Sequence, residues 1–196
     1  MQERPTIDTP RLTLRPFRLT DAPAVQRLAS DRDIASTTQH IPHPYEAGMA
    51  EEWIGTHQAR YERGEGITFA IVRRSDNALI GAVGLRVDQQ HNHDELGAWI
   101  GKPYWNQGYC TEADAAVVRY GFEVMGLNRI YASHFKRNPA SGRVLQKIGM
   151  VHEGCQRQHI QKWGVFEDSE LYGMLKSDYE WQQRSMGRGP DSTRSA

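Results

Sequence analysis

Residues 95–113 read ELGAWIGKPYWNQGYCTEA and combine a strand, a turn and a helix start in close succession. Residue types alternate over positions 95–100, which predicts a strand with Glu95, Gly97 and Trp99 on one face. The turn that follows ends at Gly108. Apolar residues at helical spacing, from Ala113 onward, then predict a helix over about residues 111–125.

The helix start after Gly108 has the features of an anion site. Free backbone N–H groups and the positive end of the helix dipole favour a bound anion, and glycine lets the backbone approach it closely. A glycine before a helix is also common in plain turns. Glu112 and Asp114 suit a helix start but would repel phosphate if they faced it. Taken alone, the stretch leaves both interpretations open and favours the plain turn.

Further elements follow in both directions along the chain. Their order predicts an α/β fold (α+β in some schemes), with a mixed, mostly antiparallel, twisted sheet flanked by helices. Strands are expected at about residues 12–17, 68–73, 79–87, 129–135, 151–157 and 166–175, and helices at about 20–29, 46–63 and 138–149.

The composition suits one domain of 196 residues with 24 basic and 24 acidic residues. This balance provides no overall field for binding nucleic acid or an anionic membrane. No segment has the length of a membrane span or the pattern of a signal peptide, and the two cysteines have no metal or redox spacing. We expect a cytoplasmic protein with an N-terminal arm at 1–9, a domain at 10–177 and a tail at 178–196, disordered from about 185.

The segment Asn138-Pro139-Ala140-Ser141 is a strong helix-start signal, with Asn at the N-cap and Pro at the first helical position. Ser141 shares a helix face with Leu145, so its hydroxyl should point inward. This hydroxyl could bond to its own backbone, as many first-turn serines do, or it could donate to a buried ligand. The spacing does not separate the two possibilities.

Glu95 and His134 are the candidate proton acceptors. Glu95 shares its predicted strand face with Trp99, and a partly desolvated carboxylate there could act as a general base. As the first residue of its strand, Glu95 could equally be solvated. His134 lies inside a predicted strand and is a reserve candidate, although a structural role is the more common one for such a histidine.

Other polar clusters give weaker signals. His91 and His93 lie two residues apart in a loop without a further ligand cluster, so we expect a solvated loop and no metal site. Five basic residues fall near the expected anion site and as a group could hold a phosphate. They are Lys102, Lys136, Arg137, Arg143 and Lys147.

Several segments in this order resemble the GNAT superfamily of acetyl-CoA N-acetyltransferases, in particular the branch of the ribosomal-protein N-terminal acetyltransferases RimJ and RimL. The resemblance covers nearly the whole chain, from residue 9 to residue 172. The segments that carry it are TPRLTLR at 9–15, ELGAWI at 95–100, YWNQGYCTEA at 104–113, GLNRI at 126–130, NPAS at 138–141 and VLQKIGM at 144–150.

The resemblance implies that acetyl-CoA is the cosubstrate and that the turn holds its pyrophosphate. The family motif reads Gln/Arg-x-x-Gly-x-Gly/Ala, in which Gly108 matches the first glycine, Trp105 replaces Gln/Arg and Cys110 replaces the second small residue. Because backbone amides bind the phosphates, the substitutions leave this role possible. A helix start could also lower the pKa of the Cys110 thiol. The expected pyrophosphate contacts are Gln107, Gly108, Tyr109, Cys110 and Thr111.

The resemblance also implies that the strands at 95–100 and 129–135 splay apart and hold the pantetheine arm. Main-chain groups at Trp99 and Ile100 would then bond the arm and polarise the thioester. Asn138 resembles the residue that binds the arm. Ser141 matches the position that donates a proton to the leaving thiolate.

The expected reaction is direct transfer of the acetyl group to a primary amine, either a protein N-terminal α-amine or a small molecule. Glu95, His134 or a water would accept the amine proton, and a main-chain N–H would stabilise the oxyanion. We expect no metal, and a monomer or a homodimer. A non-catalytic acyl-CoA-binding module on the same fold is the alternative. A nucleotide-binding domain is disfavoured, since no phosphate-binding glycine motif other than this turn is present.

Overall fold

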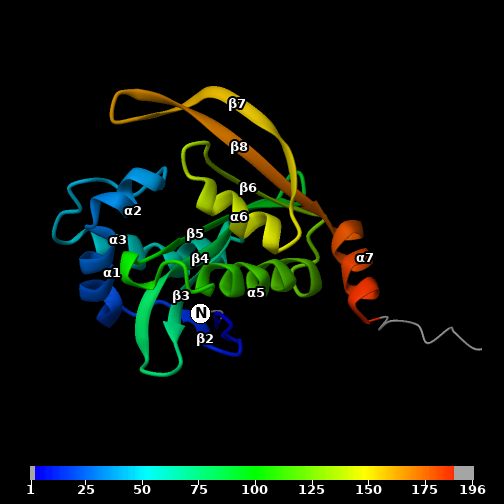
Figure 1. Ribbon diagram of the computed structural model, residues 1–196. Coiled ribbons are helices and arrows are strands. Elements are labelled where there is room, and N and C mark those ends of the chain that lie inside the picture. Colours follow the sequence, from blue (N-terminus) through cyan, green and yellow to red (C-terminus); the bar gives the residue numbers. More distant parts are fainter. Residues whose placement is uncertain (1–2, 188–196) are drawn as a thin grey trace, which may run out of the picture.

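The computed structural model describes residues 3–187. An eight-stranded sheet forms its centre, with the strand order β1-β2-β3-β4-β5-β6-β8-β7 (Figure 1). Every neighbouring pair is antiparallel except β5 and β6, which run parallel. This arrangement confirms the predicted mixed, mostly antiparallel sheet flanked by helices.

The elements alternate along the chain much as the sequence predicts. The strands are β1 (Ile7–Asp8), β2 (Leu12–Pro16), β3 (Gly66–Arg73), β4 (Ala78–Asp88), β5 (His93–Ile100), β6 (Arg129–Phe135), β7 (Val151–Lys162) and β8 (Val165–Leu175). The helices are α1 (Ala22–Ala29), α2 (Arg32–Thr37), α3 (Met49–Gly55), α4 (His57–Glu62), α5 (Tyr109–Glu123), α6 (Pro139–Lys147) and α7 (Lys176–Gly187), with short 3-10 helices η1 (Leu19–Asp21) and η2 (Lys102–Tyr104).

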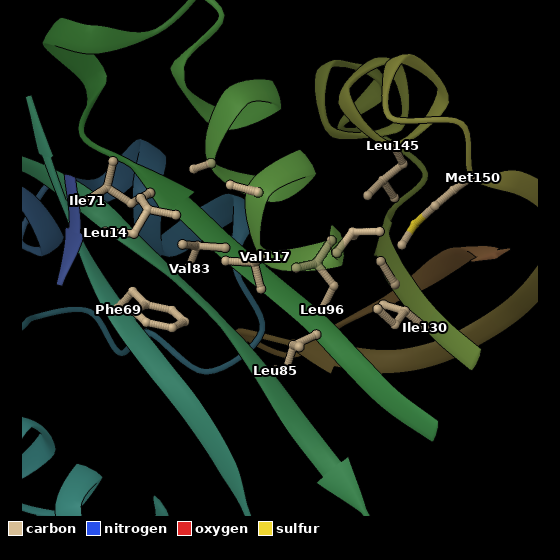
Figure 2. Packing of buried hydrophobic residues seen from close by; sticks show 14 of the residues in the cluster. Leu14, Phe69, Ile71, Val83, Leu85, Leu96, Val117, Ile130, Leu145 and Met150 are labelled. Atoms are coloured by element: carbon tan, nitrogen blue, oxygen red, sulfur yellow. The ribbon is translucent and has the colours of Figure 1, made fainter. Parts of the chain in front are cut away.

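The larger hydrophobic core lies between the sheet and helices α5 and α6 (Figures 1 and 2). Strand side chains such as Phe69 and Leu96 meet Val117 of α5 and Leu145 of α6 there. A second cluster joins the sheet to α1 and α3, with Ala70 one residue further along β3 than Phe69. Successive strand residues point to opposite faces, so the two clusters lie on opposite sides of the sheet.

Strands β5 and β6 stay together over only three residue pairs, which join residues 93–95 of β5 to residues 129–131 of β6. Beyond this point each strand keeps its other neighbour. Strand β5 pairs with β4 along its whole length, and β6 does the same with β8. The remainder of β5 therefore separates from β6, as the family resemblance implies.

Some elements differ from the sequence prediction. Part of the expected N-terminal arm forms β1, which is too short to give a periodic pattern. The six-residue helix α2 is missed, and the helix expected at 46–63 is two helices that meet at Thr56. The helix predicted over about 111–125 ends at Glu123, and Val124, which follows this last residue, is 67% exposed.

The predicted tail at 178–196 begins inside helix α7. Tyr179 anchors this helix, because its ring stacks on Phe122 and its hydroxyl donates to Glu123. Residues 188–196, where disorder is also expected, lie outside the described residues. Within residues 3–187, no helix combines the length and the apolar character that crossing a membrane requires.

His57 is a buried titratable group in the second core. Its ring packs 4.5 Å from Trp53 and 5.4 Å from Phe17, centroid to centroid, and neither ring nitrogen has a hydrogen-bond partner in the part of the chain that the structure describes. Burial lowers the pKa of His57 to about 4, and the charges of Arg4 and Arg60 add to this effect. The folded protein therefore holds His57 in its neutral form at neutral pH.

The free energy of unfolding should fall as the pH falls from 6.5 towards 4, because the unfolded chain protonates His57 in this range and the folded chain does not. The contribution of neutral His57 to the free energy of unfolding is present in full above pH 6.5 and is on the order of 3 kcal/mol. Urea unfolding of His57→Phe across this range should show a shallower pH dependence than the wild type. The exposed His159→Phe variant is the control for the loss of a histidine, and a slope in His57→Phe no different from that of this control would contradict the assignment.

Candidate active site

A cavity of about 590 Å³ passes between β5 and β6. Helices α5 and α6 line one end, which lies on the face of the larger core. Helices α1 and α3 and the loop after α2 line the other end. Residues from the two ends include Cys110, Asp114, Ser141 and Leu145 on the first side, and Val25, Gln39, His40, Met49 and Trp53 on the second.

The backbone of β5 presents free polar groups to this gap. The N–H of Gly101 donates to the carbonyl of Ile80 on β4, so alternation directs the main chain of Trp99 to β4 as well. The N–H and C=O groups of Ala98 and Ile100 point the other way, towards β6. The indole of Trp105 donates to the Ile100 carbonyl at 2.6 Å. The main chain of Ile100 thus points towards β6, although its carbonyl is already bonded to Trp105 and Ile100 is not among the residues that line the cavity. Trp99 does line the cavity, while its main chain points to β4.

Helix α5 starts at Gly108, whose φ of +79° favours glycine over residues with a side chain. The first bond within the helix runs from the N–H of Glu112 to the Gly108 carbonyl. The N–H groups of Tyr109, Cys110 and Thr111 precede this bond, and no backbone or capping partner for them is found within residues 3–187. These are three of the residues that the family resemblance implies at the pyrophosphate.

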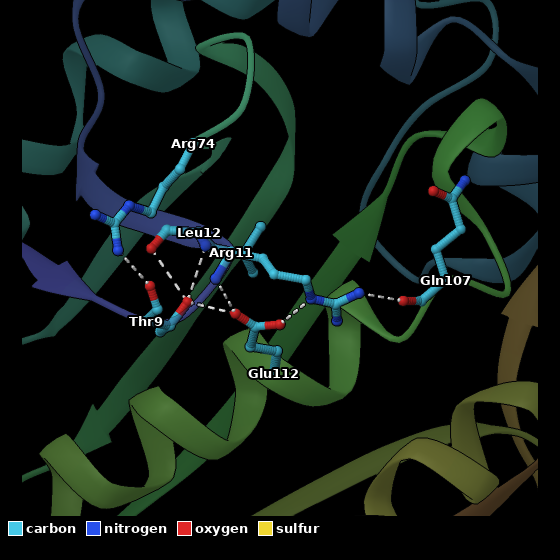
Figure 3. Close-up of polar contacts among 6 residues, drawn as sticks. All are labelled: Thr9, Arg11, Leu12, Arg74, Gln107 and Glu112. Carbon is cyan, nitrogen blue, oxygen red and sulfur yellow. Dashed lines mark hydrogen bonds and ion pairs between the residues drawn. The ribbon is translucent and has the colours of Figure 1, made fainter.

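Glu112 does not oppose an anion at this helix start, because its charge is already engaged (Figure 3). Its carboxylate accepts from the Thr9 hydroxyl at 2.7 Å and from the backbone N–H and Nε of Arg11 at 2.8 and 2.6 Å. The Arg11 guanidinium also donates to the Gln107 carbonyl at 2.8 Å, beside Gly108. Sequence analysis missed Arg11, which lies about 100 residues away along the chain.

The side chains of the turn have separate roles. Gln107 is exposed and donates from Nε2 to the Pro103 carbonyl, whereas Tyr109 is buried in the larger core beneath Arg11. Cys110 faces the cavity and its thiol donates to Asp114 at 3.6 Å. Burial and the neighbouring carboxyl raise the pKa of Cys110 well above its usual value. The expected lowering of this pKa by the helix start is therefore wrong, since desolvation outweighs the helix dipole.

The start of α6 follows the prediction closely. Asn138 occupies the N-cap, although its side chain makes no capping hydrogen bond. Ser141 lines the cavity, and its hydroxyl has no hydrogen-bond partner among the described residues. Of the two possibilities for Ser141, the structure therefore favours a donor that faces the cavity over a serine bonded to its own backbone.

His134 lines the same cavity and is 7% exposed. Its Nδ1 lies 2.9 Å from the Phe135 carbonyl, which can only accept, so Nδ1 carries the hydrogen. In the neutral ring, Nε2 is then an acceptor, and it is buried with no partner among the described residues. Nε2 lies 2.7 Å from where a side chain on Gly142 would begin, so only glycine fits beside it on α6.

Glu95 lies at the junction of two cavities. It lines the cavity already described and a second one of about 420 Å³ along β6 and the β7–β8 hairpin. Its carboxylate is 24% exposed and pairs with Arg86 at 3.4 Å. The Glu95 carboxylate is therefore only partly solvated, and its surroundings include a charged partner as well as the strand face that it shares with Trp99.

Most of the candidate phosphate-binding cations are engaged elsewhere. Lys102 pairs with Asp33, Arg137 with Glu167, and Lys136 with Asp168 and Glu170. Arg143 and Lys147 are exposed on α6 and have no ion pair within residues 3–187.

In the loop that holds His91 and His93, the two imidazole rings stack on each other. Over residues 3–187 as a whole, no three His, Cys, Asp or Glu side chains group as metal ligands would.

Asp114 and His40 are further cavity residues that sequence analysis did not select. Asp114 is 3% exposed rather than solvated at the helix start. His40 comes from the loop after α2, a segment without a periodic pattern. Burial and the charge of Arg86 lower the pKa of His40, which keeps it neutral at physiological pH.

Comparison with known proteins shows the family to which this chain belongs. Residues 11–151 match the family described as acetyltransferase (GNAT) domain. The chain is 34% identical to the uncharacterized N-acetyltransferase YoaA of Bacillus subtilis, over 88% of this chain and 97% of YoaA. It is 25% identical to the ribosomal protein uS5-alanine N-acetyltransferase of Escherichia coli, over 83% and 92% of the two chains.

A solved structure shares the fold. The ribosomal L7/L12 α-N-protein acetyltransferase RimL, in complex with coenzyme A, superposes with a TM-score of 0.80 at 16% identity, over 87% of this chain and 98% of RimL. The chain belongs to the GNAT acetyltransferase family. It is an acetyl-CoA-dependent acyltransferase, which confirms the class that the sequence resemblance implies.

Proposed function

We propose that the cavity takes acetyl-CoA from the α5–α6 face and a primary amine from the α1–α3 face. The observation that carries this proposal is the passage between β5 and β6. Ser141 lines it on the α6 side, and Glu95 lies where it meets the second cavity. The proton donor and the proton acceptor that the reaction needs thus border one continuous space.

The residues present fit the cosubstrate. Free N–H groups of Tyr109, Cys110 and Thr111, with the Arg11 guanidinium nearby, suit a pyrophosphate. The gap-facing main chain of Ala98 and Ile100 suits an amide-containing arm. Asn138 at the N-cap of α6 is proposed to contact the same arm, as the family resemblance implies, although it is not among the residues that line the cavity. The exposed cations Arg143 and Lys147 are candidates for the 3′-phosphate.

The chain's residues would supply the proton transfers. An ammonium has no lone pair, so Glu95, directly or through water, accepts a proton from the acceptor amine. As the amine nitrogen bonds to the acetyl carbon, a main-chain N–H facing the gap stabilises the oxyanion. The carbon–sulfur bond then breaks, its electron pair goes to sulfur, and Ser141 donates the proton that converts the thiolate to a thiol. The nitrogen of the new amide still carries one extra proton, which passes through water to the Ser141 oxygen and restores the hydroxyl. His134 is the second candidate for proton acceptor, through its free Nε2.

The acceptor we propose is the α-amino group of a protein, as in the RimJ and RimL branch. The second cavity supports this choice, because it extends from the reaction site at Glu95 along the β7–β8 hairpin and could hold residues that follow the amine. The E. coli relative is an alanine N-acetyltransferase of a ribosomal protein. We propose a cytoplasmic location on the same grounds. A small-molecule amine that fills only the first cavity is the second candidate.

Gly108→Ala tests the pyrophosphate site against a matched control. Gly108 and Gly126 have φ values of +79° and +69°, so alanine at either position should cost about 1 kcal/mol in strain. We expect CoA affinity, measured by titration calorimetry, to fall at least about tenfold in Gly108→Ala, because the new methyl group blocks close approach to the helix start. Gly126→Ala, which has no atom within 4 Å of its new carbon, should bind normally. Equal affinities in both variants would place the phosphates elsewhere.

Ser141→Ala should lower kcat by about a hundredfold and leave KM for acetyl-CoA nearly unchanged, since the hydroxyl acts on the leaving thiolate rather than on binding. The assay is free-thiol release from acetyl-CoA with peptides and small amines as acceptors. An unchanged kcat would remove Ser141 from the mechanism. If the wild type binds acetyl-CoA but releases no thiol with any amine, the non-catalytic module is the better description.

Glu95→Gln should reduce the rate most near neutral pH, where the acceptor amine is still protonated and needs a base. At higher pH the free amine is more abundant, so the deficit should shrink. The measurement is kcat/KM for the acceptor between pH 6 and 10, with His134→Asn examined in parallel. A deficit of equal size at every pH would show that Glu95 does not act as the base.

A further inference from the structure

Asp114 is a buried carboxyl for which the proposed mechanism has no use. It lies in the second turn of α5, is 3% exposed, and borders the cavity beside Cys110. One carboxyl oxygen, Oδ2, accepts from the Cys110 thiol at 3.6 Å. The other, Oδ1, is buried and has no hydrogen-bond partner among residues 3–187.

Burial of the Asp114 carboxyl lowers the stability of the protein unless a further group in the cavity forms a hydrogen bond with it. A buried charge without a partner destabilises a protein strongly, and a neutral carboxylic acid does so less. Desolvation raises the pKa of Asp114 to about 7, against a smaller lowering by the Cys110 thiol. Near neutral pH the group is therefore shared between an O–H donor and a charged acceptor. Either form leaves Oδ1 able to make one more hydrogen bond.

The other polar groups of the cavity do not satisfy Oδ1. Glu95 pairs with Arg86, and Glu112, two residues before Asp114, pairs with Arg11 on the outside of the helix. His134 and Ser141 also border the cavity, but neither makes a hydrogen bond with Asp114. The missing partner is therefore a group that enters the cavity.

The chemistry of that partner follows from the route of the cavity. On the proposed function, the cosubstrate runs from the start of α5 into the gap between β5 and β6, and its pantetheine arm carries two amides. An amide offers both an N–H donor and a C=O acceptor, which match the two forms of a carboxyl. We infer that Asp114 is a cosubstrate-binding residue that hydrogen-bonds an amide of the pantetheine arm through Oδ1. This inference rests on the proposed function.

The test compares two ligands that differ in the arm. Coenzyme A carries it, and adenosine 3′,5′-bisphosphate has the nucleotide without it. We expect Asp114→Leu to bind CoA about tenfold more weakly, as measured by titration calorimetry, and to bind the bisphosphate within twofold of the wild type. Asp114→Asn, which keeps a donor and an acceptor, should lose less. Its smaller change in shape also secures a folded variant if the leucine does not fold.

Asp94→Asn is the matched control. Asp94 is fully buried, and both of its carboxyl oxygens lack partners within residues 3–187, but it does not border the cavity. Its substitution should change the free energy of unfolding and leave both affinities unchanged.

Two results would overturn the inference about Asp114 and leave the proposed function standing. In one, Asp114→Leu and Asp114→Asn both bind CoA as the wild type does. In the other, they weaken CoA and the bisphosphate equally, which would indicate a general change at the helix. Failure of the wild type to bind CoA more tightly than the bisphosphate would overturn the proposed function together with the inference.

Discussion

The separation of β5 from β6 is the constraint on which the site depends. Each strand keeps a complete ladder of hydrogen bonds on its other side, so the sheet stays intact although its middle opens. The inner edge of β5 then carries N–H and C=O groups that would be costly to bury without partners. The Trp105 indole satisfies the Ile100 carbonyl, and the remaining groups face the cavity. Opening the sheet thus creates both a passage and the polar groups that line it.

The start of α5 depends on a second balance, between charge and the helix dipole. Acidic residues in the first turns stabilise a helix, but a free carboxylate beside the exposed N–H groups would repel a phosphate. Glu112 avoids this conflict because Thr9 and Arg11 hold its carboxylate against the first strands. Asp114 avoids it by burial. Both carboxyls remain in the helix while its N-terminus stays available.

Local sequence patterns were sufficient for the central elements and for the backbone of the site. The alternation at 95–100, the glycine before α5 and the Asn-Pro start of α6 each specify structure over a few residues, and the resemblance joined them into one site. What escaped prediction depends on distant contacts. The role of Arg11 requires a partner about 100 residues away, and α7 forms where Tyr179 meets Phe122. The thiol of Cys110 behaves contrary to expectation because burial, which no local pattern encodes, exceeds the influence of the helix start.

The two ends of the passage lie on opposite faces of the sheet and are built from different parts of the chain. One end draws on helices α5 and α6, and the other on the segment before β3. Selection can therefore act on the two ends separately. On the proposed function, substitutions in the first third of the chain can change the acceptor while the end that takes acetyl-CoA stays the same. A lineage with this architecture can then diversify what it modifies without rebuilding the site for the cosubstrate.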